Sequence, residues 1–143
     1  ATAATSAASP RISNTGESHI SEVHEGVVRS SRVTPEDFGL ARAAIGDLQG
    51  GDRQENAEII RRILAGDPGP RRDIVLMNAA AALVVGGKAR DLKQGVARAA
   101  ESVDSGAAAK KLDALIALSQ TLAAAYASTI TYRRKRPTGN PSV

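Results

Sequence analysis

The glycine pair at residues 50–51 is the first place where this sequence could bind an anion. Glycine-rich turns that lead into a helix bind phosphate because unpaired backbone N–H groups at the helix N-terminus point at the ligand. Asp52 follows the pair, and Glu55 stands three residues later. A carboxylate at position 52 would accept those N–H groups itself and repel a phosphate, and Glu55 would complete a capping box. We therefore expect a capped helix start here rather than a phosphate site.

Metal binding would need the two histidines, His19 and His24, to converge on one ion. They lie five positions apart around a run with strand character, and successive side chains of a strand point to opposite faces. The pair therefore cannot share an ion from that strand. The sequence also has no cysteine and no His-Glu-x-x-His pattern, which are usual sources of zinc ligands. We expect no metal site.

A catalytic nucleophile is suggested only by Asp104-Ser105-Gly106. This segment lacks the Gly-x-Ser-x-Gly pattern of the strand-turn-helix elbow that exposes a catalytic serine. A glycine after a polar residue is instead typical of a helix end. We therefore expect no catalytic residue and no cofactor-binding residue in this chain.

The elements that would position these residues begin with a β-hairpin. Two short runs with β propensity, 19–24 and 27–33, lie on either side of Glu25-Gly26. A glycine at that place can supply the positive φ of a tight turn. After the hairpin, Thr34-Pro35 predicts a single helical turn, which Gly39 ends.

Capping residues and glycines predict three further helices. They run from Asp52 to Gly66, from Arg71 to Val85, and from Asp91 to about Asp104, the last with Gln94 as capping-box partner. In the first helix the expected buried stripe is Ala57, Ile60 and Leu64, flanked by Ile59 and Ile63. The apolar run 74–85 predicts a buried core helix in the second.

A long last helix is predicted after Gly106. One of its faces carries Leu112, Leu115, Ile116, Ser119, Leu122, Ala123 and Tyr126. Residues 114–132 hold no charge and precede a basic cluster, which is the length and flank of a membrane span. Six polar side chains interrupt that stretch: Ser119, Gln120, Thr121, Ser128, Thr129 and Thr131. An amphipathic helix is therefore the better interpretation.

Composition indicates one modest domain with a thin core. The 143 residues include only three aromatic side chains, Phe38, Tyr126 and Tyr132. Aromatic side chains dominate the burial in most cores, so we expect either a partner surface or a missing half.

The net charge of +4 has a local origin in Arg133, Arg134, Lys135 and Arg136, since the chain holds 19 basic and 15 acidic residues in all. The body is neutral and has no aromatic stacking surface, which argues against a nucleic-acid-binding fold. The basic tail is either a solvated end or a docking arm for RNA, acidic protein or anionic lipid.

The chain begins at Ala1 and its single methionine is Met77, which indicates a processed, truncated or partial polypeptide. Residues 1–9 are free of acids and rich in alanine, serine and threonine. They fit either the remnant of an organellar transit peptide or an arbitrary flexible end. The expected compartment is organellar (mitochondrion or plastid) or cytoplasmic, and not the secretory route.

Motifs spread along the chain carry a resemblance to a known family. In order they are Phe38-Gly39-Leu40, Leu48-Gln49-Gly50-Gly51-Asp52, Glu55-Asn56-Ala57, Gly69-Pro70-Arg71-Arg72-Asp73, Leu76-Met77-Asn78-Ala79-Ala80-Ala81-Ala82-Leu83 and Asp104-Ser105-Gly106-Ala107. Each is weak alone, but their order and spacing are specific. Over residues 12–120 the sequence resembles the C-terminal third of anthranilate phosphoribosyltransferase, a glycosyltransferase of tryptophan biosynthesis.

The resemblance implies an α+β fragment, with a β-hairpin followed by four or five helices from the end of the family's α/β domain. It also implies that the glycine-rich phosphate loop, and the parts that hold phosphoribosyl diphosphate and anthranilate, lie upstream of this segment. The family carries an Asp-Glu pair before an Ile-Ser or similar dipeptide, and that pair binds the magnesium that accompanies the diphosphate. Alignment on Ile12-Ser13 places Pro10 and Arg11 at the pair. Neither side chain can ligate magnesium, so no cofactor is expected in this chain.

Two functions stay open at this stage. The chain is either a fragment or degenerate relative of the transferase that is inactive alone, or a structural subunit of a larger, possibly organellar, assembly that reuses the fold as a packing module. We divide it into a low-complexity lead (1–11), the transferase-like segment (12–120), and a helix extension with a basic tail (121–143), called the C-terminal arm. Contact with other protein chains, RNA or anionic lipid is expected through Leu122, Tyr126, Arg133, Arg134, Lys135 and Arg136.

Overall fold

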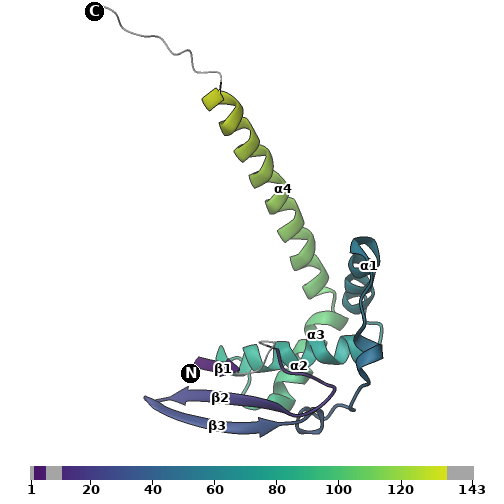
Figure 1. Ribbon diagram of the computed structural model, residues 1–143, viewed down its shortest axis with the longest axis vertical. Coiled ribbons are helices and arrows are strands. Elements are labelled where there is room, and N and C mark those ends of the chain that lie inside the picture. The colour runs from purple at the N-terminus through teal and green to yellow at the C-terminus, as the bar shows by residue number, and fades with distance from the viewer. Residues whose placement is uncertain (1, 6–10, 135–143) are drawn as a thin grey trace, which may run out of the picture. The chain divides into compact units, whose positions relative to one another are not determined.

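A computed structural model describes residues 2–5 and 11–134, with side chains given for 11–23 and 25–126. It divides into two compact units, Ala1–Ala109 and Lys110–Val143. In its described part, the first unit holds a sheet and three α-helices (Figure 1). The second unit consists, in its described part, of most of the last helix.

The sheet has three antiparallel strands in the order β1-β2-β3, namely Thr2–Thr5, Ser18–His24 and Val27–Val33. In the hairpin, Ser18 pairs with Val33 and His24 with Val27. Glu25 and Gly26 both have positive φ, 50° and 79°, as a tight two-residue hairpin turn requires. The predicted hairpin is therefore confirmed.

The strand β1 was not predicted from the sequence. It lies in the alanine- and threonine-rich lead and pairs with β2, with Thr2 opposite Val23 and Thr5 opposite Ile20. The strand has no alternating pattern of its own, so only its partner strand defines it. The connection between β1 and β2 is also too long to carry the signature of a tight hairpin turn.

Two short 3-10 turns follow the sheet, η1 (Pro35–Phe38) and η2 (Ile45–Leu48). The predicted turn at Thr34-Pro35 is η1, which ends at Gly39 with φ 75°. The turn η2 was not predicted. The α-helices are α1 (Arg53–Leu64), α2 (Pro70–Val85), α3 (Leu92–Asp104) and α4 (Ala107–Arg134). They confirm the α+β class and the predicted order of a hairpin followed by four helices.

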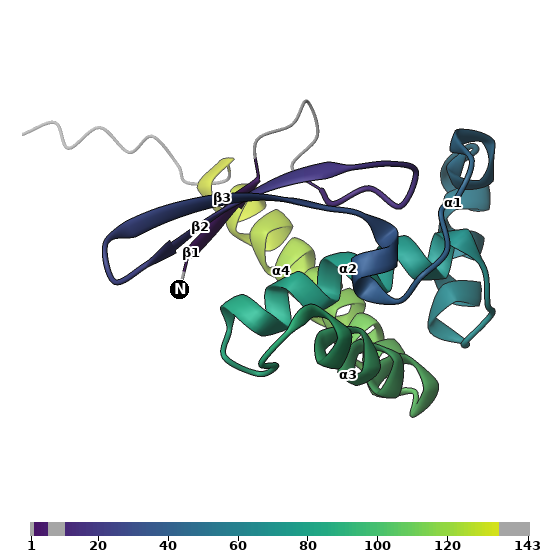
Figure 2. The same cartoon turned by 90° about the horizontal axis from the view of Figure 1, so that it is seen from below.

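The core of the first unit lies where α2 meets the sheet and α3. Five buried residues form one cluster: Ile12, Val33, Phe38, Met77 and Ala80. A second cluster joins α2 to α3 and consists of Leu76, Ala99 and Val103. In Figure 2, α2 and α3 lie side by side on the same side of the sheet. The helix α2 thus contributes buried residues to both clusters, as expected for the core helix that the apolar run 74–85 predicted.

Gly95 allows the close approach of α3 to α2. A Cβ atom at this position would lie 2.8 Å from the Cα and the Cβ of Ala80, which is closer than non-bonded carbon atoms can pack. Glycine inside a helix costs stability relative to alanine. Here it is required because the two backbones meet.

The expected buried stripe of α1 is partly wrong. Ile60 is 48% exposed, and no residue of α1 is fully buried. The side chains that are partly covered are Ala57, Ile59, Ile63 and Leu64. Periodicity predicts the helix correctly, but it cannot say how much of the apolar face the neighbouring elements of this chain cover.

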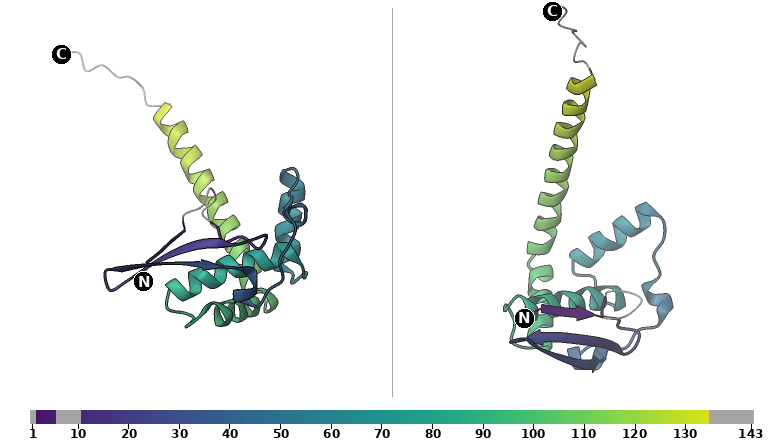
Figure 3. Two further views of the ribbon diagram at one scale, coloured as in Figure 1. Left: turned by 60° about the horizontal axis from the view of Figure 1, so that its bottom comes forward. Right: turned by 60° about the vertical axis from the view of Figure 1, so that its left-hand side comes forward.

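The second unit is described by α4 beyond Ala109. Several of its large apolar side chains are exposed: Leu115, Ile116, Leu118, Leu122 and Tyr126. Figure 3 shows α4 from two further directions as one continuous helix. Among the described residues, no helix is both long enough and apolar enough to cross a lipid bilayer.

Candidate functional site

Residues 12–14 are held firmly against the start and middle of α2. Asn78 accepts a hydrogen bond from the Ile12 N–H at 3.0 Å and donates one to the Ile12 carbonyl at 2.9 Å. Asn14 is fully buried and its Nδ2 donates to the Pro70 carbonyl at 2.8 Å. The Ala43 N–H donates to the Asn14 carbonyl at 2.8 Å. Residues 12–14 are therefore hydrogen-bonded both to α2 and to the segment at Ala43.

The residues that the sequence alignment places at the family's metal position are Pro10 and Arg11. Pro10 lies outside the described residues, and Arg11 is exposed and cationic. Elsewhere in the described chain, no group of three or more histidine, cysteine, aspartate or glutamate side chains is close enough to hold an ion. His19 lies 3.7 Å from Glu17, which also pairs with Arg32 at 3.2 Å. The side chain of His24 lies outside the described residues, so the predicted separation of the two histidines stays a prediction.

The start of α1 is a capping box, as expected. Asp52 accepts hydrogen bonds from the N–H groups of Gln54 and Glu55 at 2.7 and 2.9 Å, and the Glu55 side chain accepts one from the Asp52 N–H at 2.9 Å. The side chains of Glu55 and Asn56 fold back over Gly51 and Gly50, so a Cβ at either glycine would collide with them. These groups use the donors that a phosphate would need.

The start of α3 differs in one detail from the prediction. Asp91 accepts a hydrogen bond from the Gln94 N–H at 2.8 Å, and this bond lowers the pKa of Asp91. The Gln94 side chain, however, accepts from the N–H of Arg90 at 2.9 Å rather than from that of Asp91. The cap is therefore confirmed, but its reciprocal partner lies one residue earlier.

The segment at 104–106 is a helix end, as predicted. Ser105 is the C-cap of α3, and Gly106 follows it with φ 73°. Asp104 accepts from Arg72 Nη2 at 2.7 Å, which joins the end of α3 to the start of α2.

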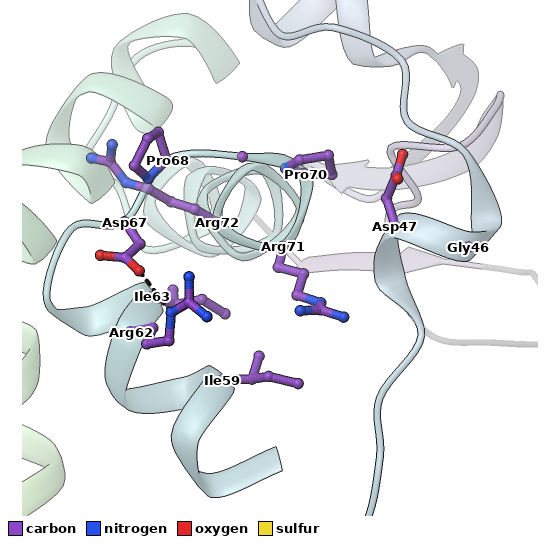
Figure 4. Close-up of a pocket in the computed structure, with 11 residues that line it drawn as sticks. Gly46, Asp47, Ile59, Arg62, Ile63, Asp67, Pro68, Pro70, Arg71 and Arg72 are labelled. Carbon is purple, nitrogen blue, oxygen red and sulfur yellow. Dashed lines mark hydrogen bonds and ion pairs between the residues drawn. The ribbon is translucent and has the colours of Figure 1, made fainter. Parts of the chain in front are cut away.

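A hollow of about 400 Å³ lies in the first unit. It lies between the end of α1, the turn at 65–69, the first turn of α2 and η2 (Figure 4). Three arginines line it, Arg62, Arg71 and Arg72, with Asp47 and Asp67 beside them. A second hollow of about 300 Å³ adjoins it and shares Ile59, Arg62 and Arg71. Sequence reasoning assigned none of these residues to a site, although Gly69-Pro70-Arg71-Arg72 marks a helix start with two basic residues in its first turn.

The lining of the hollow contains both positively and negatively charged side chains. Arg62 pairs with Asp67 at 2.8 Å, and Arg72 with Asp104 at 2.7 Å. Partial burial raises the pKa of Asp73 on the first turn of α2, and the neighbouring Arg72 opposes that shift. Such a site can accept an anion. Its described lining holds no histidine, cysteine, serine or lysine, and its candidate bases are the carboxylates of Asp47 and of Asp67, which is paired with Arg62.

The residues expected to contact a partner are not gathered into a site. Leu122 and Tyr126 are 60% and 71% exposed on α4. The side chains of Arg133, Arg134, Lys135 and Arg136 lie outside the described residues. Their predicted role stays a prediction.

Known proteins are similar to this chain in sequence and in fold. Residues 4–109 match the family described as glycosyl transferase family, a/b domain. The anthranilate phosphoribosyltransferase of Geobacter sp. (strain M21) is 53% identical over 107 residues, which are 75% of this chain and 30% of that protein. That of Rhodopseudomonas palustris (strain TIE-1) is 52% identical over 108 residues, 76% of this chain and 32% of that protein.

Solved structures give the same result. The crystal structure of anthranilate phosphoribosyltransferase from Thermus thermophilus matches with a TM-score of 0.68 and 38% identity, over 76% of this chain and 32% of that chain. The Saccharomyces cerevisiae enzyme in complex with PRPP and Mg matches with a TM-score of 0.65 and 25% identity, over 73% and 30%. These findings confirm the resemblance that the sequence motifs carry. The chain spans about a third of the length of the relatives it matches.

Proposed function

Because this chain belongs to the glycosyl transferase family, a/b domain, we propose that it supplies part of the α/β domain of an anthranilate phosphoribosyltransferase and is inactive by itself. One observation carries the proposal. Identity above 50% extends over three quarters of this chain but is confined to less than a third of the relatives' length. A similarity this strong and this local is what a segment of the enzyme would give.

The chemistry of the parent reaction explains why the segment alone would be inactive. Transfer of phosphoribose from its diphosphate to the anthranilate amine requires stabilisation of the leaving diphosphate and of a developing oxocarbenium ion. The arginines of the hollow are engaged by Asp67, Asp104 and the Gln49 carbonyl. Arg11 stands where the family holds an acidic metal ligand. Neither these arginines nor Arg11 therefore offers a group to which a step of the transfer could be assigned.

In the enzyme, this segment would hold the backbone near the substrate site in position without contacting the substrate. Asn78 and Asn14 tie residues 12–14 to α2, and Ile12 is buried in the core that α2 forms with the sheet. The backbone that follows the aligned metal position at Pro10 and Arg11 is therefore anchored to α2. Positioning of this kind is how a scaffold contributes to catalysis without touching the substrate.

The first prediction tests this function. The purified chain should form no phosphoribosyl anthranilate from phosphoribosyl diphosphate and anthranilate in the presence of magnesium. Product can be followed by the loss of anthranilate fluorescence. The full-length Geobacter relative, assayed under the same conditions, is the positive control. Magnesium-dependent product formation by the purified chain would refute the proposal.

A structural subunit of a larger assembly is the second candidate, and α4 favours it. Leu115, Leu118, Leu122 and Tyr126 are exposed, and they lie beyond the matched residues 4–109. Apolar side chains grouped on one helix commonly mark a protein interface. The mass of the native polypeptide discriminates between the candidates: a chain as long as the relatives supports the enzyme segment, and one of about 14.8 kDa supports the subunit.

A further inference from the structure

Arg71 carries the one guanidinium of the hollow that lacks an acidic partner among the described residues. Its Nη2 donates to the Gln49 carbonyl at 2.7 Å, while its Nε is buried and has no hydrogen-bond partner. The Nε of Arg72 is likewise buried and without a partner, but Arg62 and Arg72 each have a carboxylate within 2.8 Å. Figure 4 shows Arg71 reaching into the open space between Ile59 and Asp47, whereas Arg72 turns to the other side of α2.

A half-buried guanidinium in this state favours an external anion. Arginine stays charged at all physiological pH values and offers five N–H donors in a planar fork. Burial without a counter-charge has a desolvation cost that a carboxylate can offset, especially through two parallel hydrogen bonds. The hollow also opens at the N-terminus of the 16-residue helix α2, where the helix dipole adds to the positive potential.

The acidic and apolar residues of the lining determine which class of anion fits the hollow. Asp47 and Asp67 line the same hollow, and Glu55 and Glu58 line its neighbour. These carboxylates disfavour a dianion such as phosphate but leave room for a single negative charge. Apolar surface beside Arg71 comes from four residues, Ile59, Ile63, Pro68 and Pro70. A carboxylate next to an apolar group matches both features.

Exposed apolar side chains on the elements that form the hollow favour a polypeptide over a small molecule. Ile45 of η2 is 80% exposed and Ile60 of α1 is 48% exposed, although neither lines the hollow itself. A protein surface that covers η2 and α1 would bury them, whereas a small carboxylate would not. The relatives are about three times as long as the matched segment. The remaining two thirds of such an enzyme could therefore supply the surface that covers these side chains.

We propose that the Arg71 hollow is the docking site for an acidic side chain, aspartate or glutamate with an apolar neighbour, from the part of the transferase that this chain does not match. This inference rests on the proposed function and deepens it, because it names the surface and the charge through which the two parts meet. Arg71 would form the ion pair at the centre of the contact, and the partner surface would cover η2 and α1 around it.

The test uses two co-expressed polypeptides, so that both fold together. One is this chain with an affinity tag, and the other is the part of the Geobacter relative that lies outside the matched region. The isolated complex is diluted, and its dissociation constant is measured by analytical ultracentrifugation. Arg71→Met should weaken association about tenfold, which is ~1.4 kcal/mol, and high salt should reduce the difference. Arg61→Met is the matched control, because Arg61 is an exposed arginine on the neighbouring helix α1 and does not line the hollow.

Each outcome decides a separate question. Equal affinities of the wild-type and Arg71→Met chains would overturn the docking proposal and leave the proposed function intact. Failure of the wild-type chain to co-purify would count against both. If Arg71→Met lowers the helix content measured by circular dichroism, Arg71→Gln replaces it, because glutamine can still donate to the Gln49 carbonyl but carries no charge. Undiminished association of that variant would equally overturn the proposal.

Discussion

At the scale of single residues, polar side chains take the place of backbone pairing at several points of the fold. Asn78 contacts both polar groups of Ile12 and also donates to the Ile74 carbonyl at 2.8 Å. Asp52 and Glu55 satisfy the first N–H groups of α1. These roles differ in how far they could be predicted. The cap has a local signature, whereas the contact of Asn78 with Ile12 joins residues 66 positions apart.

Replacement of Asp52 tests the capping role. Asp52→Ala should lower the free energy of unfolding by about 0.5–2 kcal/mol, because two N–H groups of α1 lose their acceptor. Thermal melts with and without phosphate provide the measurement. Asp52→Asn is the control, since asparagine caps helices about as well as aspartate. A variant Asp52→Ala that gains phosphate binding with no loss of stability would instead indicate an anion site.

Replacement of Gly95 tests the close approach of α3 to α2. In an open helix, Gly→Ala would stabilise by ~1 kcal/mol, but here the new Cβ would collide with Ala80. Gly95→Ala should therefore destabilise the chain by about 1–3 kcal/mol, as overpacked cores do, measured by urea denaturation.

The double variant Gly95→Ala with Ala80→Gly should recover part of that loss, because it removes one of the colliding atoms. Ala97→Gly, at an exposed position on the same helix, should cost only the ~1 kcal/mol of helix propensity. An increase in stability on Gly95→Ala would show that the helices are farther apart than described.

At the scale of elements, the sequence predicts those parts whose signals are local. The hairpin, the four α-helices and η1 follow from turn glycines, caps and apolar periodicity. The strand β1 and the exposure of Ile60 could not be predicted, because a neighbouring element determines each of them. The hollow around Arg71 was missed for the same reason. Its lining comes from η2, α1, α2 and the turn before α2, and no spacing along the chain brings these together.

At the scale of the whole molecule, the division into two units coincides with the end of the family match. The first unit ends at Ala109, and so does the matched region. Both hydrophobic clusters lie within the first unit. We therefore expect the hydrophobic stabilisation of the fold to come mainly from the first unit.

Deletion of the C-terminal arm tests that separation. A chain without residues 121–143 should keep the thermal stability of the first unit, because the described side chains of the arm, 121–126, are all exposed. It should also lose any binding to single-stranded RNA or to vesicles of phosphatidylserine and phosphatidylcholine that the full chain shows at low salt. Binding by basic side chains weakens as salt shortens the screening length to about 8 Å at physiological ionic strength. A truncated chain that binds with unchanged salt tolerance would show that the arm is a solvated end.

The amide of Asn78 has a consequence for how the chain reaches its native state. A side-chain amide that faces the N–H and C=O of Ile12 imitates the peptide group of a neighbouring strand. It can do so only once α2 has formed, since Asn78 takes its position from that helix. We therefore expect residues 12–14 to become ordered after α2, because their contact with Asn78 joins residues 66 positions apart, and contacts of large sequence separation form slowly. The contact between Ile12 and α2 would then be among the later contacts of the first unit to form.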